Sequence, residues 1–329
     1  MIGEGRIVEG RDDDPSSVRA LSAVPKVVIS QREDVGLPQH VVVDGGCASV
    51  GVVVITYNAG RVIGACLASL LSQTVQPEKI VVVDCGRTDS TRDILSRFPN
   101  VSVVASEKGF ARQRNAGAKH ISSKYILFVD ADMVLDPYLI EEALTLAAAG
   151  FESLVIPERF VGSGYWGRVR AFERRFYDGI NCIEGARWHT RSAYVSVGGY
   201  DDALELGEEW DIDERMRNHY CVGRTLRGIL CDEGGPSLQS LLRKKAYYTL
   251  HSDGFRHFRA KHPSRAAQIL SPSFRLWLFA RHPLWLLLHP ALAAGVMVLG
   301  AGELAIVRSV RVRLHFASDP WRGPEKALG

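Results

Sequence analysis

Short apolar runs alternate with amphipathic stretches along the part of the chain that follows residue 49. Val50–Ile55, Ile80–Val83 and Tyr125–Val129 are continuous runs, the first two made almost entirely of β-branched residues, which predict buried strands. The segments between them predict a shorter strand at 101–104 and helices at 62–71, 88–96 and 111–120. Strands and helices at this spacing predict β-α-β units. We therefore expect an α/β fold with a mostly parallel, Rossmann-like sheet and helices on both faces.

The first 48 residues have a different pattern. They are polar and charged, are interrupted by prolines, and contain only short β-like runs at 27–29 and 41–43, which predicts a loosely ordered extension. Charged residues come before any apolar run, a pattern that excludes a secretory signal peptide. The cysteines are widely spaced and form no C-x-x-C pair, as in a reducing compartment. We expect the part of the chain that follows this extension to lie in the cytoplasm.

A long apolar run lies near the C-terminus. Leu284–Val307 has about the length, ~20 residues, that is needed to span a bilayer. His289 and Pro290 near its start and Glu303 near its end weaken a single span, and arginines flank both ends without setting an orientation. Three interpretations stay open: a span, an interfacial helix leading into a partly inserted one, and a buried core helix. We favour membrane contact, peripheral or single-span, at the cytoplasmic face of the cell membrane.

Composition narrows the class of protein. The chain has 329 residues, 46% of them hydrophobic, with 40 Lys+Arg against 37 Asp+Glu and a formal charge of +3. This balance excludes a disordered polyelectrolyte and a small disulfide scaffold. The basic residues are dispersed, so we expect no nucleic-acid partner.

Polar residues stand where three of the predicted strands end. They are Thr56-Tyr57-Asn58, Asp84, and the pair Asp130 and Asp132. Ligands of open α/β sheets bind at the carboxyl ends of the strands, so the three groups together favour a nucleotide site over ordinary turn residues. Two carboxylates at alternate positions suit a hard cation, Mg²⁺ or Mn²⁺.

The motifs together resemble those of family-2 glycosyltransferases with the GT-A fold, of a membrane-associated bacterial type, over about residues 50–260. The matching stretches are Val53–Asn58, Leu67–Thr74, Val81–Thr91, Ala111–Gly117, Tyr125–Asp132, and Gly198–Asp202 leading to Gly207–Ile212. The resemblance implies an inverting, hexosyltransferase-like reaction on a nucleoside-diphosphate sugar. It also implies four parts: an extension (1–48), a nucleotide-sugar-binding half (49–133), an acceptor-binding and catalytic half (134–262), and a membrane-associated helical region (263–329).

The same resemblance implies roles for individual residues. Donor-binding roles fall to Thr56, Tyr57, Asn58, Asp84, Arg114, Asn115 and Asp130. Asp132 would coordinate the metal, with Asp130 as a second candidate that faces the ribose or a metal-bound water. Cys85 and Arg87 depart from the family's usual residues and leave recognition of the base undetermined by sequence. Cys231 stands where many relatives have a histidine, so metal binding would depend on Asp132, the diphosphate and water alone.

Glu208 and Glu209 match the acidic pair that contains the catalytic base in this family. Glu209 stands where aspartate is more usual, so its reach is one methylene longer; Glu208 takes the role if the register differs. A simple acidic first turn of a helix would also explain one of the two. An acceptor hydroxyl needs a base whereas a lipid phosphate does not. We therefore favour a saccharide, glycolipid or secondary-metabolite hydroxyl over polyprenyl phosphate; a nucleotidyltransferase and a non-catalytic membrane scaffold also stay open.

Two further segments have less specific patterns. Gly162–Gly167 satisfies G-x-G-x-x-G, but Tyr165 and Trp166 are too bulky for a pyrophosphate loop. These two aromatics and Trp188 fit acceptor-side loops or packing about equally. Arg243–Tyr248 is basic and aromatic and suits either phosphate contact or a solvated helix.

Overall fold

The computed structural model describes residues 49–86, 88–204, 206–250 and 253–317. The predicted N-terminal extension and the departure at Arg87 lie outside these residues. The described part belongs to one compact unit that begins after His40.

A seven-stranded sheet forms the centre of the described part, in the order β3-β2-β1-β4-β8-β6-β9. Its strands are β1 (Val50–Thr56), β2 (Lys79–Asp84), β3 (Val101–Ala105), β4 (Tyr125–Asp130), β6 (Ser153–Val155), β8 (Ala186–Thr190) and β9 (Val222–Arg224). Strands β3, β2, β1 and β4 are parallel to one another, whereas β8 is antiparallel to both β4 and β6. The prediction of a mostly parallel sheet is confirmed.

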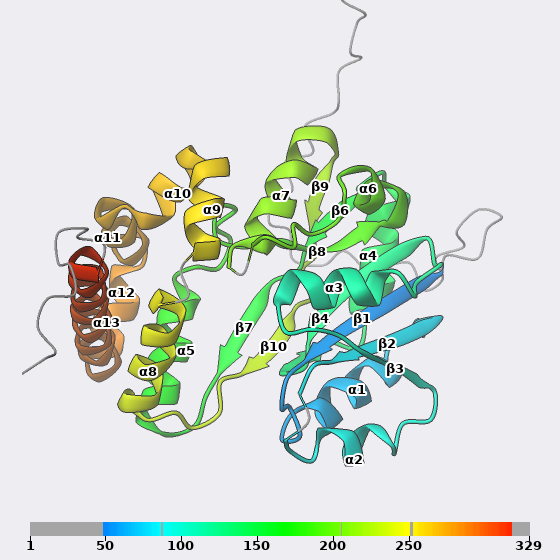
Figure 1. Cartoon of the computed structure of the whole chain (residues 1–329), viewed down its shortest axis with the longest axis horizontal. Helices are drawn as coiled ribbons and strands as arrows, with labels where there is room; N and C mark the ends of the chain where they lie inside the picture. The colour runs from blue at the N-terminus through cyan, green and yellow to red at the C-terminus, as the bar shows by residue number, and fades with distance from the viewer. Residues whose placement is uncertain (1–48, 87, 205, 251–252, 318–329) are drawn as a thin grey trace, which may run out of the picture. The chain divides into compact units, whose positions relative to one another are not determined.

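Helices cover both faces of this sheet (Figure 1). The bounds of those up to residue 219 are α1 (Ile63–Leu71), α2 (Thr91–Leu95), α3 (Phe110–Ala118), α4 (Leu139–Ala148), α5 (Gly164–Arg175), α6 (Arg191–Ser196) and α7 (Glu208–His219). Alternate residues of β1 enter different cores, because neighbouring side chains of a strand point to opposite faces. Val52 packs with α1 and α4 in one core, and Val53 packs with α3, α6 and α7 in the other.

Close packing of α3 on β1 depends on one glycine. A Cβ added at Gly117 would lie 2.3 Å from Cγ1 of Val53. No ordinary side chain fits there, so glycine lets the helix lie directly on the strand. Gln113, one turn earlier, donates from Nε2 to the carbonyls of Thr56 and Val83 at 3.0 and 3.1 Å. The helix is thereby fixed against the ends of β1 and β2, next to the predicted nucleotide site.

A second, three-stranded sheet lies beyond the end of β4. It has the order β5-β10-β7 and consists of β5 (Met133–Leu135), β7 (Glu158–Val161) and β10 (Ile229–Asp232). Cys231 on β10 pairs with Met133 on one side and Phe160 on the other. The small sheet therefore brings three segments that are far apart in sequence next to Asp132.

Short helices form most of the C-terminal part. The helices after residue 237 are α8 (Leu238–Leu250), α9 (Asp253–Lys261), α10 (Pro263–Leu270), α11 (Pro272–Ala280), α12 (Pro283–Leu288) and the longer α13 (Pro290–Ala317). The last four each begin at a proline, which suits the first position of a helix but interrupts a preceding one. The apolar run predicted at 284–307 is consequently divided at His289 between α12 and α13.

Candidate functional site

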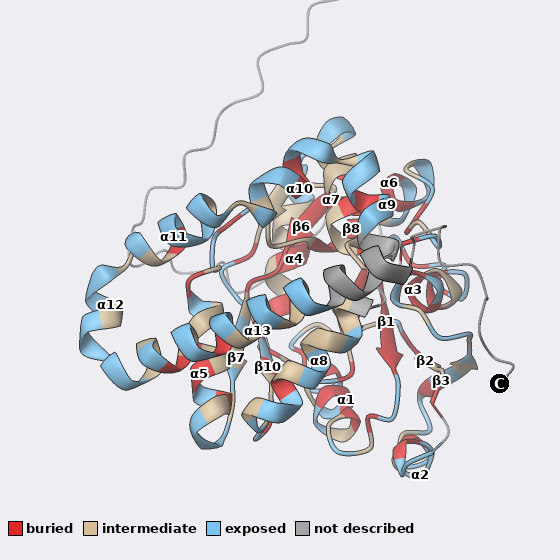
Figure 2. Ribbon diagram, turned by 60° about the vertical axis from the view of Figure 1, so that its left-hand side comes forward, coloured by how far each residue is buried: buried red, intermediate tan, exposed pale blue. Residues whose placement is uncertain are grey.

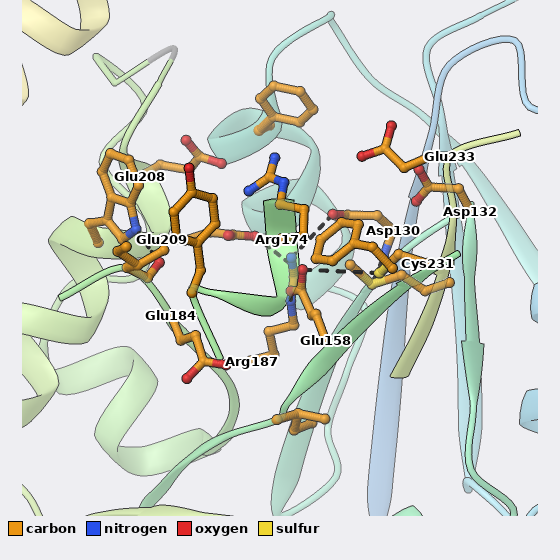
Figure 3. A pocket seen from close by; sticks show the side chains of 18 of the residues that line it. Asp130, Asp132, Glu158, Arg174, Glu184, Arg187, Glu208, Glu209, Cys231 and Glu233 are labelled. Carbon is orange, nitrogen blue, oxygen red and sulfur yellow. Dashed lines mark hydrogen bonds and ion pairs between the residues drawn. The ribbon is translucent and has the colours of Figure 1, made fainter. Parts of the chain in front are cut away.

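A cavity of about 330 Å³ lies beyond the carboxyl end of β4 (Figure 3). Its walls come from β4, the small sheet, β8 and the starts of α3 and α7, with α5 and α8 contributing side chains. Acidic residues are the most numerous charged group in the lining: Asp130, Asp132, Glu158, Asp178, Glu184, Glu208, Glu209, Asp232 and Glu233. Arg174, Arg187 and Lys244 are the cations of the lining.

Two backbone features bring the predicted carboxylates to this cavity. Asp130 ends β4, and Asp132 follows in the turn before β5, so the D-x-D pair leaves the sheet at the cavity. On the other side, Gly207 precedes α7 with φ +86°, a left-handed conformation that favours glycine. The helix then begins with Glu208 and Glu209, both in the cavity lining. The predicted metal and base residues therefore do share one site.

Arg114 joins these two groups of carboxylates. Its side chain is 2% exposed, and Nη2 donates to Oδ1 of Asp130 at 2.9 Å and to Oε1 of Glu209 at 2.6 Å. Nη1 donates to Oε1 of Glu208 at 2.7 Å. A buried charge is tolerated when it is paired in this way, and the guanidinium fork holds several oxygens at fixed positions. The family resemblance predicts that Arg114 braces the nucleotide; in this structure it is enclosed among protein carboxylates.

A second arginine, Arg187 on β8, completes the network and was missed by the sequence analysis. Its Nε donates to Oε1 of Glu158 at 2.6 Å, and Nη2 lies 3.3 Å from Oδ2 of Asp130. Nη1 lies 2.9 Å from Oε1 of Glu209, an ion pair without hydrogen-bond geometry. Figure 3 shows Arg187 among these carboxylates. A single arginine in the short segment Ala186–Thr190 was the available signal, but its position depends on how β8 pairs with β4.

The predicted donor residues at the other strand ends lie beside the cavity and do not line it. Thr56 is buried at the end of β1, and its Oγ1 has no hydrogen-bond partner within the described residues. Tyr57 is exposed, with Nζ of Lys108 4.3 Å from its ring centre. Asn58 has φ +50°, and Asp84 accepts a hydrogen bond from the amide of Gly86 at 3.1 Å. Polar groups at the ends of β1 and β2 therefore lie next to Asp130, outside the cavity lining.

Asn115 is engaged elsewhere. Its Oδ1 accepts hydrogen bonds from the hydroxyl of Tyr194 at 2.6 Å and the amide of Tyr200 at 3.0 Å. Its Nδ2 donates to the carbonyl of Tyr200 and to Asp202. The side-chain amide of Asn115 thus holds Tyr194 and the Gly198–Asp202 segment against α3. Asn115 is therefore not among the residues that line the cavity.

Comparison with known proteins agrees with this architecture. Residues 51–200 match the model of Glycosyl transferase family 2. Residues 51–200 therefore form a glycosyltransferase family 2 domain. It is 31% identical over 103 residues to the uncharacterized glycosyltransferase YibD of Escherichia coli (strain K12), an alignment that covers 30% of each chain. The predicted family is confirmed.

Two other comparisons extend this result for the family-2 glycosyltransferase. The beta-1,3-glucosyltransferase WfaP of Escherichia coli, whose name gives UDP-Glc as its donor, is 32% identical over 87 residues, 25% of this chain and 35% of that protein. A solved structure of the mannosyltransferase PcManGT from Pyrobaculum calidifontis, in complex with GDP-Man and Mn²⁺, superposes with a TM-score of 0.50 at 16% identity. It covers 82% of this chain and 88% of that one, and shows the GT-A fold. The alignments with YibD and WfaP span only about a third of those proteins.

Electrostatics distinguish the carboxylates that line the cavity. Burial opposes ionisation of Asp130, but Arg187 and Arg114 outweigh it and hold the pKa of this carboxyl below its ordinary value. Burial raises the pKa of Glu208 to about 7, with Arg114 opposing the rise and Glu209 adding to it. Asp132 is open to solvent yet withdrawn among the cavity walls, which together with the charge of Asp130 raises its pKa to about 6. Asp132 has no close arginine to lower its pKa. At Glu208, burial outweighs the opposing effect of Arg114, so its pKa is raised as well.

The two carboxylates predicted to bind a metal have different surroundings. Each oxygen of Asp130 already binds an arginine, Oδ1 to Arg114 at 2.9 Å and Oδ2 to Arg187 at 3.3 Å. Asp132 has no such partner, and Mg²⁺ and Mn²⁺ are commonly held by one or two carboxylates together with substrate phosphates. Within the described ranges, no group of three or more His, Cys, Asp or Glu residues could hold a metal by itself. Of the two predicted metal residues, Asp132 is the one whose carboxylate is not bound to an arginine.

Cys231 faces the cavity from β10, at the position where many relatives have a histidine. Its thiol lies 4.0 Å from Oε2 of Glu158, and burial raises the pKa of this thiol far above its ordinary value. A neutral, buried thiol is a poor ligand for a hard cation. Cys231 is therefore not a candidate ligand for Mg²⁺ or Mn²⁺.

The glycine-rich and the basic segments occupy different places. The glycines of Gly162–Gly167 let backbones approach: a Cβ at Gly162 would lie 2.6 Å from the carbonyl oxygen of Gly167. Trp188 is fully buried and stacks on Tyr125 at 5.2 Å, which is a packing role. The basic and aromatic segment 243–248 lies on α8, where Lys244 lines the cavity.

Proposed function

We propose that this family-2 glycosyltransferase transfers a hexosyl group, with inversion, from a nucleoside-diphosphate sugar to a hydroxyl group of a saccharide, glycolipid or small-molecule acceptor. One observation carries the proposal: Asp130 and Asp132 at the end of β4 share a cavity with Glu208 and Glu209 at the start of α7. Glycosyl transfer needs both groups at one place, the first for the donor and the second for the acceptor.

The donor would bind along the ends of β1, β2 and β4. Thr56 offers a buried hydroxyl without a partner among the described residues, Tyr57 an exposed ring, and Asp84 a carboxylate beside them. Buried polar groups are normally satisfied, so an unpaired hydroxyl at a strand end is a candidate contact for a ligand. The nucleotide sugars named for WfaP and PcManGT, UDP-Glc and GDP-Man, support a nucleotide sugar as the class.

Glu209 is the proposed general base. Its side chain is 26% exposed against 8% for Glu208, so an acceptor can reach it more easily. Arg114 and Arg187 both bind Oε1, which fixes the carboxylate in place. In the proposed step the acceptor oxygen bonds to the anomeric carbon and its proton passes to Glu209. The bond to the nucleoside diphosphate breaks on the opposite side, which inverts the configuration.

Asp132 is the proposed ligand for Mg²⁺ or Mn²⁺. When bound, the ion would supply a Lewis acid for the charge of the departing diphosphate. Lys244, which also lines the cavity, is a further cation for phosphate oxygens. Asp130 instead positions Arg114 and Arg187, and through them Glu209.

We also propose that the enzyme acts at the cytoplasmic face of the membrane. Pro290–Ser309 within α13 is long and apolar enough to span a bilayer, by length and composition, and only 17% of its apolar window is buried. Membrane contact would suit a lipid-linked acceptor. Neither a nucleotidyltransferase nor a scaffold without catalysis explains why a partly exposed carboxylate, Glu209, is held by two buried arginines.

The test begins with the donor. UDP, GDP, dTDP, CDP and ADP, each with Mn²⁺, are screened for a rise in melting temperature, since a ligand stabilises the native state according to its affinity. The matching nucleotide sugar is then supplied with simple saccharide acceptors. Release of nucleoside diphosphate and the anomeric configuration of the product, by NMR, are measured. Pyrophosphate release would instead indicate a nucleotidyltransferase.

Variants separate the roles. Glu209→Gln is expected to lower transfer to hydroxyl acceptors by about 10²–10⁴-fold without loss of donor binding. Asp132→Asn is expected to abolish the effect of Mn²⁺ on donor binding. Glu214→Gln, on the same helix but outside the cavity, is the matched control and should keep full activity. If Glu209→Gln glycosylated polyprenyl phosphate at the normal rate, the hydroxyl acceptor would be wrong.

A further inference from the structure

The helix α13 is apolar on two opposite faces. Its inner face packs on α5 and α8, where Leu299 contacts Val169 and Leu241 in a small separate core. Its outer face, in steps of three and four residues, is exposed: Ala294, Met297, Val298, Ala301, Leu304, Ala305 and Arg308. A surface helix of a soluble domain has polar residues on its outer side. The outer face of α13, as far as Arg308, lacks them except at that arginine.

The exposed apolar surface continues over the neighbouring helices. Leu287 and Leu288 on α12 are 73% and 72% exposed, and Leu276 on α11 is 71% exposed. Figure 2 shows α11, α12 and the outer side of α13 as largely exposed. An exposed apolar patch spread over three consecutive helices, with Trp277 exposed on α11, marks an interaction surface.

The charges on this surface have one sign. Glu303 is the only acidic residue in 263–309. It points inward, with Nζ of Lys245 at 3.4 Å and Nη1 of Arg170 at 3.8 Å. The exposed cations are Arg275, Arg281 and Arg308. An apolar surface bordered by arginine and tryptophan suits an anionic lipid surface.

The contacts of the inner face of α13 indicate whether this helix lies on a membrane or spans it. A Cβ at Gly295 would lie 2.4 Å from Cγ2 of Val169, and one at Gly302 would lie 2.9 Å from Cδ2 of Leu242. The helix is therefore packed closely on α5 and α8 along two turns. If α13 crossed the bilayer in this packing, the charges of Arg170, Lys245 and Glu303 would enter the hydrocarbon with it, at high cost.

We propose that α11, α12 and α13 form a monotopic docking surface. In this arrangement α13 lies in the plane of an anionic lipid surface, with its inner face on the catalytic unit and its outer face in the interface, and it does not span the bilayer. The inference refines the proposed membrane contact and does not depend on the transfer reaction. Since α5 and α8 also line the cavity through Arg174 and Lys244, only one layer of helices separates that surface from the site.

The full-length protein is tested by flotation with phosphatidylcholine vesicles, with and without about one third phosphatidylglycerol. It should bind the anionic vesicles more strongly, lose binding as salt rises, and be released by alkaline carbonate. The double variant Met297→Glu/Leu304→Glu should lose about tenfold or more in binding, because each side chain leaves the interface. Val195→Glu, an exposed apolar position on α6, is the matched control and should bind normally.

Three results would overturn the proposal. Resistance to alkaline carbonate would show a span. Equal binding by the double variant and Val195→Glu would show that this surface is not the docking face. A dimer in light scattering that the double variant dissociates, with no vesicle binding, would show that a second copy covers it. All three are independent of transferase activity, so they also leave the proposed reaction to its own test.

Discussion

Arg187 is the residue whose loss should have the largest effect on both the fold and the site. Its guanidinium is 5% exposed and contacts Asp130, Glu158 and Glu209 at 3.3, 2.6 and 2.9 Å. Arg187→Met keeps much of the volume but leaves three carboxylates around an apolar side chain, two of them, Asp130 and Glu209, still paired with Arg114. Removing one partner from a buried ion network typically costs about 3–5 kcal/mol, because the remaining charges stay desolvated.

The assay is urea unfolding followed by circular dichroism. We expect the free energy of unfolding of Arg187→Met to fall by about 3–5 kcal/mol without a change in the denaturant slope. Arg227→Met is the matched control: Arg227 is 43% exposed and lies 3.6 Å from Asp136, so its loss should cost less than about 1 kcal/mol. Equal costs for the two variants would refute the claim that the network at Arg187 is energetically special.

A second change isolates the pair with Glu158. This carboxylate contacts Arg187 but not Arg114, so Arg187→Met/Glu158→Gln removes a charge of each sign. We expect the double variant to recover part of the stability, with a coupling energy above about 1 kcal/mol. Activity should not recover with it, because Glu209 still lacks one of its two arginines. Recovery of both together would mean that Arg187 acts on catalysis only through stability.

Three smaller predictions follow from single contacts. The pKa of Glu208 is raised from 4.5 to about 7, so the folded protein binds a proton at this carboxyl more tightly than the unfolded chain does. The resulting stability is fully present below about pH 4.5 and is lost as pH rises through about 7. Glu208→Gln should flatten this part of the stability profile, by at most about 3 kcal/mol, in melts across that range. Gly117→Ala should cost about 1–3 kcal/mol in chemical unfolding, because its Cβ would meet Val53 at 2.3 Å. Gly207→Ala should cost about 1 kcal/mol of stability, since φ +86° is strained for alanine and Phe258 lies 3.1 Å from the new Cβ. It should also lower kcat more than this stability loss explains. An unchanged kcat would show that the start of α7 tolerates the shift.

Local patterns were sufficient for the elements of the first half. The β-branched run at 50–55 became β1, and the run at 80–83 became β2 with one residue added at each end. Such runs are decided by side-chain shape and burial within a few residues, which a sequence displays directly. The polar residues at the strand ends followed from the same logic, because parallel strands bring their carboxyl ends to one edge of a sheet.

The boundary between α12 and α13 could also be anticipated. His289 and Pro290 interrupt the apolar run, since proline lacks the amide needed inside a helix. The run itself, however, could not show that one face of α13 packs on α5 and α8. That depended on Gly295 and Gly302, whose contacts in α5 and α8 lie well over fifty positions earlier in the chain, at Val169 and Leu242.

The sequence by itself determined the family, the parallel sheet and the two pairs of carboxylates, because these depend on short motifs and on periodicity. Only the tertiary structure decided that Arg114 lies among those carboxylates, that Asp130 binds two arginines, that Asn115 holds a loop, and that Arg187 joins the network. Ion pairs between residues 16 to 95 positions apart have no local signature. Their geometry is fixed by strand pairing and by close packing at glycines. In the low dielectric of the interior each ion pair is stronger than in water, and each unpaired charge costs more free energy.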